Sequence, residues 1–539
     1  MNFQRILRAS ALVPACVALA ACVTTNSSVP DVNGAAGNSD TGGATPGGSA
    51  GTSSSSAGSG GSGTAGVSTG GNGTAGSGAS GGGTAGSGAG GTGTGTAGNG
   101  TAGISTGGAT GGSGTGGSAT GGVGIAGAGA GGAAGASGGG TAGSGVGGGS
   151  SGGAGATSGE DEGADCTVAN LPASASLPTI AKLPDPFTKL DGTRMSTQAE
   201  WRCRREEILK QAEQYIYGTK PGTPTSVSGT VSNTNITVNV TDKGKSTSFS
   251  ASVVLPGTGS GPYPAIVVLG GATFGAPLDP AVIKSEGIAI INYDPYLLGK
   301  EGTPRNNKQG AFYDIAGNSS TAGLLVAWAW GVSRLIDVIE QSGGAILKAD
   351  AVAVAGCSRF GKGAFATGIF DQRIALTMPI ESGSGGVPIW RGIPGEGAQT
   401  PSSAYGEQPW LGDAFSSFTN KVTALPIDTH ELVAMVAPRG LFIMDNPFIA
   451  NLGPKSAHVA ALGGAEVFKA LGAGDNITYY SNVQNGTHCS MRPEWSAPLR
   501  SNIRKFLTKT GSDPGVINAS ASATGNLSTW RDWTTPVLN

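Results

Sequence analysis

The sequence predicts an α/β fold with a largely parallel central sheet, and three features of the chain support this prediction. Continuous apolar runs at 265–269, 288–291 and 374–380 are typical of strands that are buried on both faces of a sheet. Segments with helical spacing separate these runs, as right-handed crossover connections require. A fourth run, 350–357, ends at a serine between glycines and leads straight into a helix-compatible segment.

The elements that precede this sheet have a different pattern. Ser196 can cap a helix that begins near Trp201 and is stopped by Gly218. Apolar and polar residues alternate at 236–240 and 249–255, which predicts two half-buried antiparallel strands. Buried parallel strands are expected only after this pair.

Strands and helices alternate around and after the serine. The predicted elements are a helix at 321–341, a strand at 374–380, an irregular stretch to about 426, a helix at 430–435, a strand at 440–444, a helix at 455–471, a strand at 477–481 and a last helix at 494–507. Active groups of parallel sheets gather beyond the carboxyl ends of the strands. Ser358, Glu381, Asp445 and His488 all follow such ends, and this coincidence indicates a hydrolase.

Ser358 occupies the apex of the predicted strand–turn–helix unit, which is the layout of a nucleophile elbow. Gly356 precedes it by two positions and Gly361 follows it by three. The usual elbow has its second glycine one position earlier, where this chain has Phe360. The alternative interpretation is an ordinary strand-to-helix turn in which Ser358 caps the helix.

A catalytic serine needs an imidazole to take its proton and a carboxylate to orient that imidazole. His430 and His458 fall on predicted helices and are expected to be structural. His488 follows a late strand, in the Ser–acid–His order of α/β-hydrolases, and is the expected base. The acid stays open between two residues. Asp445 holds the usual position but can also form a local turn, whereas Glu381 ends the strand after the elbow.

The first 22 residues have the features of an export signal. Arg5 and Arg8 precede an apolar run that is too short to span a bilayer, and the run ends in Leu19-Ala20-Ala21-Cys22. This ending resembles the lipobox of bacterial lipoproteins, in which the cysteine is lipidated and becomes the mature N-terminus. Val23 is compatible with sorting to an outer membrane in such proteins. The alternative is a plain secretory signal with an unmodified cysteine, and both predict export.

Residues 23–160 are expected to form a flexible linker. Of the 99 glycines, 56 lie between residues 31 and 160, and Asp40 is the one charged residue between Val32 and Ser158. Such a tract has too little apolar surface to offset the entropy of ordering its chain. Residues 161–539 are then one large α/β-hydrolase domain. The net charge of −2 and the lack of a basic stripe give no indication of nucleic-acid binding.

Cys166, Cys203, Cys357 and Cys489 remain outside the signal region. Exported chains commonly form disulfides, and four cysteines allow three pairings. A zinc site is the competing interpretation, but the chain has no Cys-x-x-Cys pair and only three histidines. We therefore expect disulfides and no metal, and the spacing leaves the pairing open.

The segment Gly356-Cys357-Ser358-Arg359-Phe360-Gly361-Lys362 resembles the Gly-Cys-Ser-Arg-x-Gly-Lys signature of the glucuronoyl esterases, carbohydrate esterase family 15. The resemblance extends over nearly all of residues 166–539. Further matching segments are Leu183–Phe187, Trp201–Arg205, Glu381–Gly386, Gly406–Trp410, Ala437–Phe442 and Asp532–Pro536. The cysteines and the C-terminal end are similar to the fungal-type branch.

This resemblance implies an α/β-hydrolase three-layer sandwich and assigns roles to particular residues. The implied triad is Ser358, His488 and Glu381, with the acid one strand earlier than usual and Asp445 as the alternative acid. The backbone N–H and the guanidinium of Arg359 would bind the oxyanion. The implied disulfides are Cys357–Cys489, which joins nucleophile to base, and Cys166–Cys203, which pins the N-terminal arm.

The resemblance also implies a sugar site. Lys362, Gln399 and Glu407 match the family residues that bind the hydroxyls of glucuronic acid. Family members place a tryptophan in the loop 446–454, where this chain has Asn451. This difference concerns the sugar contacts on that side, because the triad residues are all present.

The expected function is therefore hydrolysis of esters of (4-O-methyl-)glucuronic acid, as in lignin–glucuronoxylan cross-links, through an acyl-enzyme. The alternatives are another carbohydrate, feruloyl or acetyl esterase, or an inactive carbohydrate-binding lipoprotein. No cofactor is implied. We expect a monomer that contacts a membrane only through an N-terminal lipid, as an outer-membrane lipoprotein facing the cell surface or periplasm or as a released form.

Overall fold

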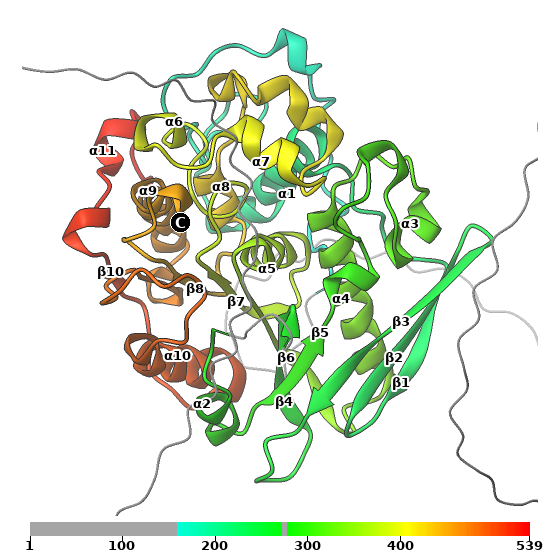
Figure 1. Ribbon diagram of the computed structural model, residues 1–539. Helices are drawn as coiled ribbons and strands as arrows, with labels where there is room; N and C mark the ends of the chain where they lie inside the picture. Colours follow the sequence, from blue (N-terminus) through cyan, green and yellow to red (C-terminus); the bar gives the residue numbers. More distant parts are fainter. Residues whose placement is uncertain (1–158, 272–276) are drawn as a thin grey trace, which may run out of the picture. The chain divides into compact units, whose positions relative to one another are not determined.

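The computed structural model describes residues 159–271 and 277–539 (Figure 1). The expected signal peptide, the lipidation site at Cys22 and nearly all of the expected linker lie outside the described residues. Within the described ranges, no helix is both long and apolar enough to cross a membrane.

One sheet organises the described part of the chain. Its ten strands follow the order β1-β2-β3-β5-β4-β6-β7-β8-β9-β10. The strands are β1 (Ser226–Val231), β2 (Asn235–Asp242), β3 (Lys245–Val254), β4 (Tyr263–Leu269), β5 (Ala289–Tyr293), β6 (Leu347–Cys357), β7 (Ile374–Ile380), β8 (Gly440–Met444), β9 (Ile477–Tyr480) and β10 (Ile517–Asn518). Strands β1, β2 and β3 pair antiparallel, β3 also pairs antiparallel with β5, and every later pairing is parallel.

Helices cover both faces of this sheet. They are α1 (Trp201–Ala212), α2 (Pro280–Ser285), α3 (Ala311–Ala316), α4 (Leu324–Gln341), α5 (Arg359–Phe370), α6 (Ile393–Glu396), α7 (Pro401–Glu407), α8 (Thr429–Ala434), α9 (Pro454–Ala470), α10 (Ser496–Ile503) and α11 (Leu527–Trp530). Figure 1 shows α4 and α5 on one side of the central strands, and α2 close to α10 on the other. The predicted α/β fold with its mostly parallel sheet is therefore confirmed.

The strand sequences explain the two layers of helices. Along β6, Val352 and Val354 belong to the core beneath α4, α5, α8 and α9, whereas Ala353 and Ala355 belong to the core beneath α2 and α10. Successive side chains of a strand point to opposite faces, so an unbroken apolar run supplies both cores.

The strand register aligns the segments that carry the predicted site. Cys357 of β6 lies opposite Ile380 of β7, and Ile380 lies opposite Met444 of β8. The residues that follow these strand ends are Ser358, Glu381 and Asp445. Because the strands are parallel, all three residues emerge at one edge of the sheet.

Some elements differ from the prediction. Strand β1 was not expected, because SVSGTV offers few apolar residues; it is mostly exposed and is held by pairing with β2. A capping box at Thr197 and Glu200, not Ser196, starts the turn that precedes α1. The short helix α11 follows the helix that we expected to be the last, and Asn526 caps it.

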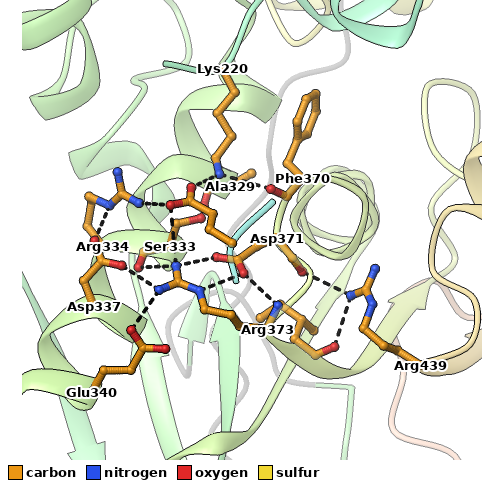
Figure 2. A network of polar contacts seen from close by, with 12 residues as sticks. Lys220, Ala329, Ser333, Arg334, Asp337, Glu340, Phe370, Asp371, Arg373 and Arg439 are labelled. Atoms are coloured by element: carbon orange, nitrogen blue, oxygen red, sulfur yellow. Dashed lines mark hydrogen bonds and ion pairs between the residues drawn. The ribbon is translucent and has the colours of Figure 1, made fainter. Parts of the chain in front are cut away.

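A buried ion-pair network ties the start of the domain to its core. Figure 2 shows Arg373 between Asp371, at 2.8 Å, and Asp337, at 2.7 Å. Glu160 adds a carboxylate that contacts Arg334, whose side chain is fully buried, and Lys220. We expected Glu160 to be the last linker residue; these ion pairs instead make it part of the folded domain.

Candidate active site

Ser358 lies at the sharp turn between β6 and α5. Its backbone has φ of 59° and ψ of −125°, a conformation that costs energy for a residue with a side chain. The N–H of Ser358 donates to the carbonyl oxygen of Ile380 at 2.9 Å, which fixes the turn against β7. The side chain makes no capping hydrogen bond to α5. The alternative interpretation, in which this hydroxyl caps the helix, is therefore wrong.

The glycines around Ser358 allow backbone segments to approach closely. A Cβ atom on Gly356 would lie 2.4 Å from the carbonyl oxygen of Phe360, and one on Gly361 would lie 2.5 Å from that of Ile380. Glycine is thus needed at position 361 because the first turn of α5 packs on the end of β7. Phe360, at the position usual for glycine, has its ring against Gly270.

His488 and Glu381 are in direct contact. Nδ1 of the imidazole lies 2.7 Å from Oε2 of Glu381, and the backbone N–H of Cys489 donates to the same oxygen at 2.7 Å. Glu381 is completely buried, whereas the side chain of His488 is 41% exposed. A carboxylate at this distance from Nδ1 holds the ring with its Nε2 edge available for proton transfer.

Two further groups hold Glu381. The side-chain amide of Asn446 donates to Oε1 at 3.2 Å, and the guanidinium of Arg492 lies 3.5 Å from the same atom. Arg492 also donates to the carbonyl oxygen of Thr487 at 2.5 Å and to Oδ1 of Asn485 at 3.1 Å. The loop that carries His488 is therefore fastened on both sides of the histidine.

Backbone strain concentrates around this contact. In the described part of the chain, five residues other than glycine have positive φ: Lys243, Ser358, Glu381, Cys489 and Lys509. Three of the five are Ser358, Glu381 and the residue after His488. Strain of this kind persists where surrounding contacts over-determine the backbone, as at functional sites.

Asp445 lies one strand away from Glu381 and makes different contacts. Its Oδ1 accepts the backbone N–H of Asn446 at 2.9 Å, and its Oδ2 accepts the hydroxyl of Tyr479 at 3.3 Å. Burial raises the pKa of Asp445 to about 7, and the negative charge of Glu381 adds to this shift. The local turn that we considered for Asp445 is formed by the next residue. Oδ1 of Asn446 accepts the N–H of Phe448 at 3.1 Å, as in an Asx turn.

Both disulfides implied by the family resemblance are present. Cys166 pairs with Cys203, and Cys357 pairs with Cys489 with their Cα atoms 5.8 Å apart. Cys357 precedes Ser358 and Cys489 follows His488, so the second disulfide brings the serine and the histidine together although 132 residues separate the two cysteines.

The sulfur atoms of Cys357 and Cys489 also gather with Glu381 and His488, and the potential donor atoms lie within 4.8 Å of one another. A metal site of this type requires thiolate ligands. Both sulfurs are consumed in the disulfide, so this arrangement does not fit a zinc ion.

Arg359, directly after Ser358, belongs to a polar cluster with aromatic neighbours. Its guanidinium donates to Oε2 of Glu301 at 2.7 Å and lies 5.5 Å from the ring centroid of Trp410. Trp410 donates its indole N–H to Oε1 of Glu301 at 2.5 Å, and the hydroxyl of Tyr296 donates to Oε2 at 2.9 Å. Glu301 thus orients both Arg359 and Trp410.

Lys362 faces the same cluster from the first turn of α5. It is 5% exposed, its Nζ donates to the carbonyl oxygen of Ser382 at 2.5 Å, and it lies 5.2 Å from the ring centroid of Trp410. Burial lowers the pKa of Lys362 to about 8; the carboxylate of Glu407 opposes this shift. A lysine on the solvated face of a helix would not be buried in this way.

Gln399 and Glu407 meet at the outer side of this cluster. The side-chain amide of Gln399 donates to Oε2 of Glu407 at 2.7 Å, and Glu407 Oε1 lies 3.8 Å from the guanidinium of Arg359. Asn451 is exposed, and its backbone carbonyl oxygen accepts the backbone N–H of Gln399 at 3.0 Å. The loop with Asn451 therefore borders the residues predicted to bind the sugar.

The other two histidines lie in different surroundings. His430 is fully buried, its Nε2 lies 2.9 Å from the carbonyl oxygen of Pro184, and burial lowers its pKa to about 4. Nδ1 of His458 accepts the backbone N–H of Gly525 at 3.0 Å. Both rings serve local packing, in agreement with the sequence prediction.

The sequence prediction missed Glu301 and Trp410 as site residues, and also Asn446 and Arg492, which hold Glu381. Trp410 belonged to a segment quoted for the family resemblance, but without a role. Glu301 lies in a polar loop after β5, where a carboxylate by itself signals nothing. Its importance comes from two partners that are distant in sequence, Arg359 and Trp410, and from the nearby Tyr296.

Together, these residues bring a strained serine, an imidazole held by a buried carboxylate, and a cationic and aromatic wall to one edge of the sheet. This set of groups suits attack of a hydroxyl on a carbonyl carbon and transfer of its proton.

Comparison with known proteins identifies related sequences. The family described as "Glucuronyl esterase, fungi" matches residues 238–472 of the chain. The 4-O-methyl-glucuronoyl methylesterase of Hypocrea jecorina is 38% identical over 382 residues, which cover 70% of this chain and 80% of that protein.

Solved structures agree with the sequence comparison. The catalytic domain of the glucuronoyl esterase from Hypocrea jecorina superposes with a TM-score of 0.63 at 38% identity, covering 68% of this chain and all of that domain. A mutant glucuronoyl esterase from Sporotrichum thermophile, in complex with methyl 4-O-methyl-β-D-glucopyranuronate, gives a TM-score of 0.63 at 37% identity, covering 69% of this chain and 100% of that chain.

Proposed function

The chain belongs to the glucuronoyl esterase family, carbohydrate esterase family 15 of the α/β-hydrolases, and from this membership we propose that it hydrolyses esters of 4-O-methyl-glucuronic acid. The observation that carries the proposal is the distance of 2.7 Å between Nδ1 of His488 and Oε2 of the buried Glu381. The disulfide Cys357–Cys489 joins the loop that carries His488 to the turn that carries Ser358. We assign Ser358 as nucleophile, His488 as base and Glu381 as the acid of the triad.

In the first step, Oγ of Ser358 attacks the ester carbonyl carbon while Nε2 of His488 takes the hydroxyl proton. Glu381 keeps the proton of Nδ1 in place and stabilises the imidazolium that forms. The backbone N–H of Cys489 and the amide of Asn446 hold this carboxylate, so that little reorganisation is needed during proton transfer.

The negative charge on the carbonyl oxygen is then bound by the backbone N–H of Arg359 and by its guanidinium. One such donor contributes about 3 kcal/mol to transition-state stabilisation. The contact between Arg359 and Glu301 limits the rotamers of this long side chain, which supports its role as a preorganised donor.

The imidazolium of His488 next protonates the oxygen of the leaving alcohol, and the glucuronoyl group stays on Ser358 as an acyl-enzyme. A water molecule activated by His488 attacks this ester, and the uronic acid leaves. No metal or other cofactor takes part in these steps.

We propose that Lys362, Gln399 and Glu407 bind the hydroxyl groups of the glucuronic acid. The contact between Gln399 and Glu407 and the proximity of Glu407 to Arg359 support a continuous polar surface next to the serine. Trp410 is buried against Arg359 and Lys362, and we propose that it positions these two cations beside the serine. Asn451, next to Gln399, stands where family members have a tryptophan.

The natural substrate we propose is the ester link between glucuronoxylan and lignin alcohols. We further propose that residues 1–22 direct export, that Cys22 carries the lipid of an outer-membrane lipoprotein, and that 23–160 tether a monomeric catalytic domain at the cell surface or in the periplasm. The two disulfides support an oxidising compartment.

The test is to assay the purified protein on the methyl and benzyl esters of glucuronic acid beside an acetyl ester and a feruloyl ester. We expect hydrolysis of the glucuronate esters with little activity on the other two. Activity confined to the acetyl or feruloyl ester would assign the chain to another esterase class. Binding of glucuronoxylan without hydrolysis of any ester would indicate the carbohydrate-binding alternative.

A further inference from the structure

Few large apolar side chains reach solvent in the described part of the chain, and two of them flank the predicted base. The seven that are exposed are Leu190, Val254, Leu297, Phe448, Met491, Val516 and Val537. Phe448 is the aromatic one and is 57% exposed; Met491 is 54% exposed. An exposed aromatic side chain beside the predicted base is available for contact with a bound ligand.

Phe448 is built into the catalytic loops. Its N–H donates to Oδ1 of Asn446, the residue whose amide holds Glu381. A Cβ atom on Gly486 would lie 3.0 Å from Cβ of Phe448. Phe448 thus lies directly against the backbone that leads, two residues later, to His488.

Met491 lies on the other side of His488 in the same loop. Its neighbour Arg492 fastens that loop through Thr487 and Asn485 and lies 3.5 Å from Glu381. The two exposed apolar side chains are therefore carried by backbone that is held in place.

The order of the strands separates the apolar surface formed by Phe448 and Met491 from the polar cluster around Glu301 and Lys362. Glu301 follows β5 and Lys362 follows β6, whereas Phe448 follows β8 and His488 follows β9. In the order β5-β4-β6-β7-β8-β9, Ser358 follows β6 together with Lys362, and β7 separates this turn from the two strands that lead to Phe448 and His488. An ester bound at Ser358 can therefore direct one half to each side.

Proton transfer determines on which side of Ser358 the alcohol half and the uronic acid half of the ester lie. The leaving oxygen must come within hydrogen-bond reach of the imidazole of His488 to receive its proton. The alcohol half of the ester is thus on the His488 side, and the uronic acid half is on the side of Lys362.

From this arrangement, and resting on the proposed function, we propose that Phe448, assisted by Met491, forms a contact surface for the alcohol half of the ester. The class of alcohol that it selects is aromatic, because an exposed phenyl ring gains most from a second ring at stacking or edge contact. Small alcohols such as methanol do not reach it.

The test compares kcat/KM for the benzyl and methyl esters of glucuronic acid in the full-length enzyme. We expect Phe448→Ala to lower kcat/KM for the benzyl ester roughly 3- to 10-fold, the size of one aromatic contact, and to leave the methyl ester within about twofold. Phe448→Trp should keep the benzyl preference. Met491→Ala should lower it by a smaller factor of about 2.

Leu190→Ala is the matched control, since it also removes an exposed apolar side chain but lies on the segment before α1. It should change neither ester. An unchanged ratio of benzyl to methyl ester in Phe448→Ala, or an equal loss on both esters, would overturn the role of Phe448 and leave the esterase assignment intact. A wild-type enzyme that hydrolyses neither ester would refute the proposed function, and this inference with it.

Discussion

The carboxylate of Glu381 lies 2.7 Å from Nδ1 of His488, although the two residues are 107 positions apart in the chain. The loop after β9 reaches this carboxylate by passing the end of β8, where Asp445 lies. Glu381 is completely buried and has a second contact to the N–H of Cys489 at 2.7 Å. One oxygen of Glu381 thus holds both the imidazole and the backbone beside it, and the loss of either partner should impair catalysis.

Replacing Ser358 by alanine should abolish ester hydrolysis, with kcat lowered by at least about a thousandfold, because no other hydroxyl is assigned to the nucleophile position. Circular dichroism and the thermal midpoint should stay close to those of the wild type. A Ser358→Ala enzyme with full kcat on benzyl glucuronate would refute the assignment of the nucleophile.

The two candidate acids predict opposite outcomes in a pair of isosteric variants. Glu381→Gln should lower kcat by roughly 10³- to 10⁴-fold, because the imidazole loses the group that holds its tautomer. Asp445→Asn should lower kcat less than about tenfold, since the polar contacts of Asp445 are to Asn446 and Tyr479. Steady-state kinetics on the methyl ester distinguish them, and a larger loss for Asp445→Asn would reverse our choice of acid.

The two disulfides should differ in what they contribute. Removing Cys357–Cys489 with a double alanine variant should lower both kcat and stability, because this bond holds Ser358 and His488 in register. Removing Cys166–Cys203 should lower stability alone. Chain-entropy estimates for loops of these lengths are about 5 and about 4 kcal/mol, respectively. Urea unfolding and kcat measured on both double variants test this; equal effects on kcat would contradict it.

The free energy of unfolding should fall as pH rises from about 4 to about 7, because the buried carboxyl of Asp445 must then lose its proton in the folded protein. Burial, with a smaller effect of Glu381, raises the pKa of Asp445 to about 7. The folded protein then binds this proton more tightly than the unfolded chain, so the contribution is present at low pH and is lost as pH rises through this window.

The upper bound of this loss is on the order of 4 kcal/mol. Urea unfolding at pH 4 and pH 8 measures it, and Asp445→Asn, which cannot ionise, is the control. The wild type should lose stability relative to Asp445→Asn between these two pH values. A constant difference between the two proteins would mean that Asp445 does not titrate there.

Glu160 should be necessary for the stability of the domain. Glu160→Ala leaves Arg334 and Lys220 without a carboxylate that they contact in a buried network, which typically costs about 3–5 kcal/mol. Asp165→Ala is the matched control, because Asp165 pairs with Arg202 at the surface and such pairs contribute about 0–1 kcal/mol. Equal unfolding free energies for the two variants would show that Glu160 belongs to the linker.

Local sequence patterns predicted several features of the fold. The apolar runs at β4, β6 and β7 predicted buried strands because each supplies both faces of the sheet. The glycines around Ser358 predicted a tight turn for a similar reason, since side chains there would collide with neighbouring backbone. Strand β1 was missed because its stability comes from pairing with β2 and not from an apolar pattern of its own.

The sequence alone determined the fold class, the serine turn and His488 as the candidate base, because apolar periodicity, glycine positions and residue order are local properties of the chain. Residue order alone left the acid open between Glu381 and Asp445; the family resemblance implied Glu381, and the tertiary structure shows Glu381 in contact with His488. Glu381 and Asp445 both follow strand ends in neighbouring positions, and the choice depends on the path of the loop 485–492, which Cys357–Cys489 and Arg492 hold over Glu381. The structure likewise placed Phe448 against Gly486, a contact between loops of two different strands that no local pattern encodes.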